Sequence, residues 1–229
     1  MTTPVLQAID LCRYFRRGKY EVRAVDGVTL AIEAGEFVSL VGASGCGKST
    51  LLALLAGLDT PTSGHIEYLG ASLGDMSRRQ LAEYRAAQIG VVFQSFNLVP
   101  HRTALQNVEL ALYFSGFQRT ERKRRAAHTL ERLGMGDRLD HRPADLSGGE
   151  QQRVAIGRAL VKEPQIVFAD EPTGNLDQDH TMQIAELLKE LNATGKTIVM
   201  VTHNLDLAQD CSSRLIRLDY GRISEASRT

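Results

Sequence analysis

Two kinds of hydrophobic pattern alternate along this chain. Short apolar runs, rich in β-branched residues, predict strands at residues 5–9, 28–32, 37–41, 65–69, 89–93, 166–170, 197–202 and 215–218. Apolar positions at helical spacing predict a helix at 50–56 and a mostly helical stretch between the fifth and sixth strands. We therefore expect an α/β fold in one domain, residues 1–229, with a core of 1–93 and 163–229 and a helical insert of 94–162.

Composition supports one compact domain and narrows the classes of partner. The chain has 229 residues, and 43% of them are hydrophobic, which is enough to bury a core. Its 27 basic residues balance 27 acidic ones, so no global charge attracts nucleic acid, and we expect no such partner. The basic block at 122–125 lies in a segment with helical spacing, and we interpret it as the solvent-facing side of a helix.

Apolar segment lengths and cysteine usage indicate the compartment. No apolar run reaches the roughly 18 residues that span a bilayer, and the first residues lack the layout of a secretory signal. We therefore expect a cytoplasmic protein. Cys12, Cys46 and Cys211 are odd in number and widely spaced, which indicates reduced thiols and neither a disulfide framework nor a zinc site.

Residues 42–49 fit the phosphate-binding pattern G-x-x-x-x-G-K-[ST], called the P-loop below. They follow the predicted strand 37–41 and precede the predicted helix 50–56. Strand, glycine-rich loop and helix together form a phosphate cradle, because backbone N–H groups and the helix N-terminus attract an anion. The alternative is a glycine-rich turn that binds nothing.

Each P-loop residue type has a function towards a nucleoside triphosphate. Lys48 would reach the β- and γ-phosphates, and Ser49 would ligate Mg²⁺. The nucleotide-binding residues predicted in and after this loop are Gly42, Ser44, Gly45, Cys46, Gly47, Lys48, Ser49 and Thr50.

A second anchor for Mg²⁺ follows from the strand at 166–170, which ends in two carboxylates. Asp170 at the strand's tip is placed to ligate the metal ion, and Glu171 is placed to act as general base on the attacking water. The alternative is an acidic turn before Pro172, which the nearby P-loop makes the weaker interpretation.

Four further motifs complete a family pattern. The sequence Leu-Ser-Gly-Gly-Glu at 146–150, called the signature below, lies about a hundred residues after the P-loop. Gln94 follows a strand, residues 175–177 read Asn-Leu-Asp, and His203 follows the strand at 197–202. With these motifs in this order, the chain resembles the ATP-binding subunit of an ABC transporter along essentially its whole length. The signature is the most specific of them.

The resemblance implies a fold and a role for each matched residue. It implies a P-loop NTPase core with a small antiparallel β-subdomain and an inserted helical subdomain. Gln94 would contact Mg²⁺ and the attacking water, and His203 would donate to the γ-phosphate. Asp177 would belong to the nucleotide site through the D-loop, residues 175–177.

The resemblance also implies a dimer. The signature begins a helix predicted at 149–162, whose start attracts anions. Ser147, Gly148 and Gly149 would cover the γ-phosphate bound by the opposite subunit, so two ATP molecules would lie between two copies, or between this chain and a homologous ATPase. The enzyme would hydrolyse ATP with Mg²⁺.

Two positions leave alternatives open. Phe15 matches the family's base-stacking aromatic, with Tyr14 as the adjacent candidate and Val22 or Ala24 lining the same pocket; the alternative is an aromatic packed under the β-subdomain. Cys46 stands where many relatives carry serine. Thiol reagents that inactivate through Cys46, with protection by ATP, are one hypothesis, and neutral change at a tolerant position is the other.

The resemblance implies that the ATPase drives a separate protein in the membrane. We expect a separate permease, contacted by residues 95–101, although Phe96 and Leu98 can instead pack within the insert. The segments 57–64, 93–100 and 169–177 most resemble the bacterial lipoprotein-releasing and macrolide-exporting ATPases. The expected function is export or extraction from the membrane, of a lipoprotein, peptide, macrolide or lipid, with the protein peripheral on the inner face. The alternative is a cell-division type of ATPase that signals without transport.

Overall fold

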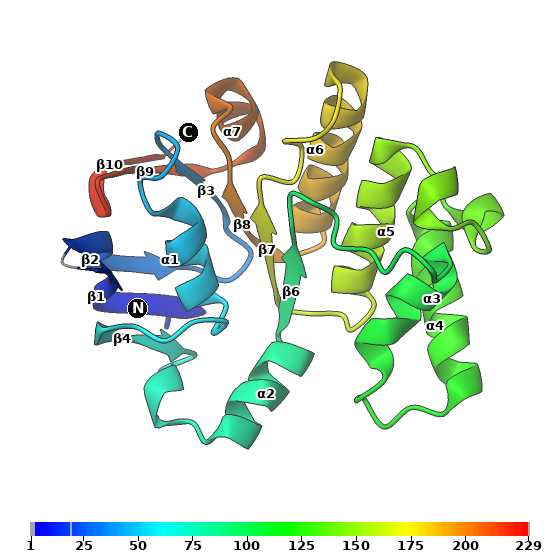
Figure 1. Ribbon diagram of the computed structural model, residues 1–229, viewed down its shortest axis with the longest axis horizontal. Helices are drawn as coiled ribbons and strands as arrows, with labels where there is room; N and C mark the ends of the chain where they lie inside the picture. The colour runs from blue at the N-terminus through cyan, green and yellow to red at the C-terminus, as the bar shows by residue number, and fades with distance from the viewer. Residues whose placement is uncertain (1–2, 19, 229) are drawn as a thin grey trace.

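Two β-sheets of unequal size organise the protein (Figure 1). The computed structural model describes residues 3–18 and 20–228. Its strands are β1 (Leu6–Arg17), β2 (Tyr20–Ile32), β3 (Phe37–Val41), β4 (Ser63–Tyr68), β5 (Ala71–Ser72), β6 (Ile89–Val92), β7 (Ile166–Asp170), β8 (Thr197–Val201), β9 (Arg214–Asp219) and β10 (Arg222–Arg228). Its helices are α1 (Lys48–Leu55), α2 (Arg78–Ala87), α3 (Ala104–Glu109), α4 (Arg119–Arg132), α5 (Gly148–Leu160), α6 (Gln178–Ala193) and α7 (Leu205–Cys211).

The larger sheet has the strand order β10-β9-β3-β8-β7-β6. Its pairs from β9 to β6 are parallel, and only the β9–β10 pair is antiparallel among the strands that the structure describes in this sheet. The smaller sheet, in the order β2-β1-β4-β5, is antiparallel throughout its described strands. Parallel strands joined by helices bring their carboxyl ends to one edge, where ligands bind in such folds.

Side chains that alternate along the central strands supply two hydrophobic cores. Val38 and Leu40 of β3 face the cluster that contains α1 and the small sheet, whereas Phe37 faces the cluster that contains α3 to α7. The same alternation separates Phe168 from Val167 on β7. This period of two is what a strand buried on both faces requires. Helix α1 therefore lies between the two sheets, and α5 and α6 lie on the other side of the large sheet (Figure 1).

The predicted α/β fold with a small antiparallel sheet is confirmed, with differences in several elements. Strands β3 and β7 have the predicted bounds, whereas β1 and β2 extend well beyond the predicted residues 5–9 and 28–32. The first half of β2 is exposed, so no apolar alternation marks it. Strand β10 and helices α2, α6 and α7 were not predicted.

Helices α3, α4 and α5 and short 3₁₀ turns occupy the segment predicted to be a helical insert. Residues 95–102 at its start are irregular rather than helical. The division into a core of 1–93 and 163–229 and an insert of 94–162 stays a prediction. Within the described residues, no helix combines the length and the hydropathy needed to cross a bilayer.

Candidate active site

A cavity of about 880 Å³ opens at the carboxyl ends of the parallel strands. Its lining comes from three regions: β2, the β3–α1 loop with the start of α1, and the segments that follow β6, β7, β8 and β9. The lining residues are Glu21, Val22, Arg23, Ala24, Ser44, Gly45, Gly47, Lys48, Ser49, Thr50, Gln94, Glu171, His203, Tyr220 and Gly221. Predicted phosphate-binding and catalytic residues that are far apart in sequence thus meet in one cavity.

The P-loop is shaped by a glycine at the N-terminal cap of α1. Gly47 has φ of 107°, a left-handed conformation that favours glycine. A Cβ at this position would also collide with the carbonyl oxygen of Ala24 on β2. No side chain caps α1, and its first turn contains no acidic residue. The first N–H groups of α1 are therefore open to an anion in the cavity.

Lys48 is the buried cation of this loop, with 6% of its surface exposed. Its Nζ donates to the carbonyl oxygens of Gly42 at 2.8 Å and Ala43 at 2.9 Å, and it lies 3.8 Å from the Cys46 Sγ. These carbonyl contacts hold the ammonium group at the mouth of the loop, where a phosphate oxygen can replace them.

Ser49 and Asp170 form a hard oxygen pair beside the loop. The Ser49 hydroxyl donates to Asp170 Oδ1 at 2.9 Å. Burial raises the pKa of the Asp170 carboxyl, and the Ser49 hydrogen bond acts in the opposite direction. A hydroxyl and one carboxylate fit Mg²⁺, which takes few protein ligands and completes its shell with phosphate oxygens and water. No group of three or more His, Cys, Asp or Glu arranged for a metal ion lies within residues 3–18 and 20–228.

Glu171 and His203 contact each other in the cavity lining. His203 Nδ1 lies 2.8 Å from Glu171 Oε2, and 16% of the Glu171 side chain is exposed against 68% of the His203 side chain. The backbone of Glu171 has φ of 47°, in the left-handed region. Such a conformation costs a non-glycine residue about 1–3 kcal/mol and is often found at active sites.

Gln94 connects the cavity to the D-loop. Its carbonyl oxygen accepts a hydrogen bond of 2.9 Å from Asn175 Nδ2. Its side chain lies against Gly174, where a Cβ would come within 2.8 Å of Gln94 Nε2. Gln94 therefore touches both the cavity and the segment that leads to Asp177.

The signature lies outside the cavity. Ser147 caps α5: its Oγ accepts from the Glu150 N–H at 3.2 Å, and its own N–H donates to Glu150 Oε2 at 2.8 Å. Gly149 packs so closely on the His180 ring that a Cβ would collide with it. Asp177 caps α6 and accepts from the His180 N–H at 2.8 Å. The signature thus lies against the start of α6, which the D-loop residue Asp177 caps. Neither the signature nor the D-loop lines the cavity that the chain's own P-loop lines.

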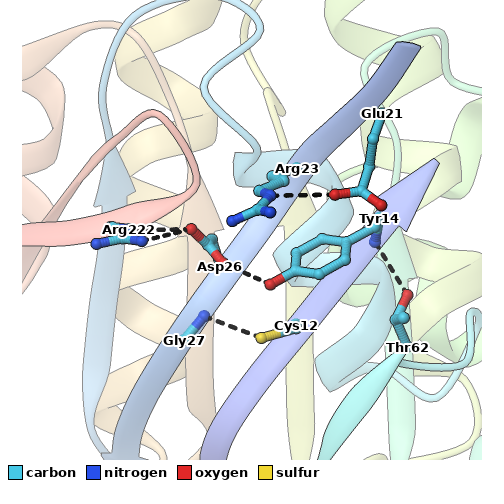
Figure 2. A network of polar contacts seen from close by, with 8 residues as sticks. All are labelled: Cys12, Tyr14, Glu21, Arg23, Asp26, Gly27, Thr62 and Arg222. Carbon is cyan, nitrogen blue, oxygen red and sulfur yellow. Dashed lines mark hydrogen bonds and ion pairs between the residues drawn. The ribbon is translucent and has the colours of Figure 1, made fainter. Parts of the chain in front are cut away.

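Phe15, Tyr14 and Cys46 also lie outside the cavity lining, as do Gly42 and Asp170. Phe15 on β1 is 41% exposed, and the Arg13 guanidinium covers its ring at 4.6 Å from the centroid. Tyr14 donates from its hydroxyl to Asp26 Oδ1 at 2.6 Å, which raises the pKa of the tyrosine (Figure 2). Cys46 is 8% exposed and belongs to the hydrophobic cluster around α1.

Gly42 precedes the cavity, and its neighbours leave it no room for a side chain, because a Cβ would meet the Leu218 carbonyl oxygen. Sequence reasoning missed several lining residues, namely Glu21, Arg23, Tyr220 and Gly221. No motif marks them, since β2 and the β9–β10 turn reach the P-loop only through the fold.

Comparison with known proteins agrees with this geometry. Residues 25–174 match the family described as ABC transporter. The chain is 50% identical over 222 residues to the uncharacterized ABC transporter ATP-binding protein YbbA of Escherichia coli K12, covering 96% of this chain and 97% of YbbA. It is 44% identical over 223 residues to the macrolide export ATP-binding/permease protein MacB of Hyphomonas neptunium, covering 97% of this chain but 34% of MacB.

A solved structure resembles the whole chain. The dimeric post-hydrolysis state of the ATP-binding cassette MJ0796, bound to ADP and Pi, has a TM-score of 0.89 and 39% identity. The matched region covers 97% of this chain and 98% of the MJ0796 chain. By the match to more than half of its length and by these identities, the chain belongs to the ABC transporter family, as an ATP-binding subunit with that family's P-loop fold.

Proposed function

We propose that this protein hydrolyses ATP between two copies of the cassette and uses the resulting closure to drive a membrane permease. The observation that carries the proposal is the cavity in which Lys48, Ser49, Gln94, Glu171 and His203 meet. The cavity collects a phosphate cradle, a hard oxygen pair and a carboxylate, which are the parts that phosphoryl transfer to water requires.

The P-loop would bind the triphosphate first. The open N–H groups at the start of α1 and the Lys48 ammonium group supply positive charge in a partly enclosed site. Lys48 would exchange its bonds to the Gly42 and Ala43 carbonyls for bonds to phosphate oxygens. Because the replaced partners are neutral carbonyls, a charged phosphate oxygen is the stronger acceptor.

Mg²⁺ would be held by Ser49 and Asp170, with Gln94 completing the set from the adjoining loop. When bound, Mg²⁺ neutralises charge that develops on the phosphate oxygens. The Ser49–Asp170 hydrogen bond holds the two oxygens 2.9 Å apart, close enough to bind one metal ion.

Glu171 would accept the proton of the attacking water. The contact with His203 holds the carboxylate at the cavity wall, and the left-handed backbone of Glu171 takes the chain out of the sheet at this point. His203, which is more exposed, would donate to the γ-phosphate.

A second copy would complete the site. The chain's own Ser147, Gly148 and Gly149 do not line its cavity, so a head-to-tail partner is required to cover the γ-phosphate. The dimeric form of the similar cassette MJ0796 supports this arrangement. Asp177 lies beside the signature through His180, and it would enter the same interface.

The permease would bind on the loop at 95–101, at the inner face of the cell membrane. Leu98 packs against the hydrophobic cluster that contains α3 to α7. The carbonyl oxygens of Phe96 and Asn97 accept hydrogen bonds from the Arg158 guanidinium. This arrangement presents an irregular, ordered loop directly after Gln94. Similarity to MacB supports export as the direction of transport.

The proposal is tested by Glu171→Gln in the full chain. Hydrolysis of ATP with Mg²⁺ should fall by about 10² to 10⁴ because the base is lost, while ATP binding persists. Light scattering should show an ATP-dependent dimer. The control is Glu83→Gln on α2, a glutamate outside the cavity, which should hydrolyse like the wild type. A Glu171→Gln protein that hydrolyses ATP normally, or that stays monomeric with ATP, contradicts the proposal.

The partner is tested by isolating tagged Glu171→Gln from native membranes with ATP and Mg²⁺. A co-purifying permease is the expected result. Recovery of cell-division proteins alone would favour a signalling ATPase and would overturn the transport part of the proposal.

A further inference from the structure

Part of the cavity lining comes from neither the P-loop nor the catalytic segments. These residues belong to two segments, 21–24 of β2 and the turn 220–221 between β9 and β10, called the nucleoside end below. If the phosphates lie at the P-loop, as the proposed function requires, this part of the lining is left for the nucleoside. The inference below therefore rests on the proposed function.

Tyr220 supplies a large ring at the nucleoside end. Among the described lining residues it is the one that carries a phenylalanine, tyrosine or tryptophan side chain, and it is 92% exposed. Phe15, the aromatic that the family pattern matches, does not line the cavity and has Arg13 over its ring. Bases stack on exposed aromatic rings with little regard to sequence, because each base has a π-face.

The turn that carries Tyr220 is fixed to the P-loop and to β2. The Gly221 N–H donates to the Cys46 carbonyl oxygen at 2.9 Å, and the Asp26 N–H donates to the Gly221 carbonyl oxygen at 2.8 Å. One residue later, Arg222 donates to Asp26 Oδ2 at 2.7 Å, and Asp26 also accepts from Tyr14 (Figure 2). These bonds hold the turn in place before any ligand arrives, which reduces the entropy lost on binding.

The backbone of Tyr220 is strained. Its φ is 48°, a left-handed conformation that glycine and asparagine adopt far more readily than tyrosine. A bulky, exposed aromatic is therefore placed where a small residue would be the more stable choice. Strain of this kind is tolerated where a residue contributes to a site.

We propose that Tyr220 contacts the base of the bound nucleotide and contributes to the affinity for ATP. Tyr220 would contact the base and not the phosphates. Its contribution to the affinity therefore requires a ligand that carries a base.

The test compares two ligands, ATP and inorganic tripolyphosphate, which lacks the base. Tyr220→Ala should weaken ATP binding roughly fivefold or more and leave tripolyphosphate binding unchanged. Tyr220→Phe keeps the ring and should bind ATP within about twofold of the wild type. The control is Phe114→Ala, another exposed aromatic outside the cavity (98% exposed), which should change neither ligand.

Tyr220→Asn separates a binding role from a structural one. Asparagine tolerates the left-handed backbone, so the melting temperature should stay equal or rise while ATP affinity falls. A lower melting temperature together with weaker ATP binding would indicate a merely structural residue and would overturn the proposal.

A spectroscopic readout is available because the chain contains no tryptophan. In Tyr220→Trp, ATP should change the fluorescence of the single indole, and tripolyphosphate should not. Equal ATP affinity of Tyr220→Ala and wild type, or an equal loss for both ligands, would overturn the proposal. A wild type that binds neither ligand would instead overturn the proposed function.

Discussion

The helix starts of α1 and α5 were both predicted to face phosphate, yet they are built in opposite ways. At α1 the cap is Gly47, no side chain satisfies the first N–H groups, and the first turn has no acidic residue. At α5 the cap is Ser147, which forms a reciprocal capping box with Glu150. Arg138 also donates to Glu150 at 3.0 Å.

The two helix starts differ in whether the chain's own side chains cap them. The N–H groups of α1 need an anion to be satisfied, and α1 lies in the cavity. At α5 the Ser147 side chain already satisfies the Glu150 N–H, so this donor needs no ligand. The Ser147 hydroxyl can still donate a hydrogen bond to a ligand, because it uses only its acceptor function in the cap.

The largest effect is expected from filling the space at the start of α1. Gly47→Ala should abolish ATP binding, because the new Cβ collides with the Ala24 carbonyl oxygen and the loop must move. Gly195→Ala, between α6 and β8, is the matched control: its φ is also positive, 91°, but nothing lies within 4 Å of a Cβ there, and it does not line the cavity. Gly195→Ala should lower the free energy of unfolding by about 1 kcal/mol and leave ATP affinity unchanged. Calorimetry with ATP distinguishes the two, and equal ATP affinity in both variants would contradict this account of the P-loop.

A smaller effect is expected at α5, and it should affect turnover rather than affinity. Ser147→Ala removes a cap worth about 1 kcal/mol and the proposed donor to the partner's γ-phosphate. Ser77→Ala removes the equivalent capping box from α2, far from either motif. Both variants should melt at similarly lowered temperatures, and only Ser147→Ala should lose ATPase activity while binding ATP normally. Equal ATPase activity in the two variants would show that the signature hydroxyl has no role in hydrolysis.

The Glu150 carboxylate gives α5 a modest pH dependence. The Ser147 N–H, followed by the Arg138 guanidinium, lowers the pKa of Glu150 in the folded protein. A lowered pKa stabilises the fold above the unfolded-state value of about 4.3, and the stabilisation is lost as pH falls through the folded-state value. Glu150→Gln should therefore lower the melting temperature at pH 7, with a difference from wild type that shrinks in acid. The exposed Glu225→Gln on β10 serves as control, and a constant difference across pH would refute the assignment.

The smallest effect is expected from Cys46, whose neighbours 42–49 otherwise form the loop. The thiol is 8% exposed and packs in the cluster around α1. Cys46→Ser should therefore change ATP affinity by less than about threefold, since position 46 would offer a phosphate its backbone N–H and not its side chain. Thiol reagents should label the buried Cys46 slowly, and ATP should not change the rate, as measured by mass spectrometry. Rapid labelling of Cys46 that ATP prevents would restore the reactive-thiol hypothesis.

The sequence allowed the fold class and the phosphate end of the cavity to be predicted, because both depend on local patterns. Strands β3 and β7 are continuous apolar runs, and the P-loop is contiguous in the chain. Helix α2 was missed because it buries only Tyr84 among its residues and shows no apolar stripe. Tyr220 was missed because its place beside β2 depends on how the two sheets pack against each other, and no residue near it in the sequence marks that packing.

The contact between Gly149 and His180 has a consequence for protein engineering. Any side chain introduced at position 149 would occupy the space of the His180 ring. A library that varies the signature alone should therefore retain glycine there, whereas one that also varies position 180 can admit alanine. Positions 149 and 180 should therefore be exchanged together. A signature taken from another cassette should be transferred with the start of that cassette's α6.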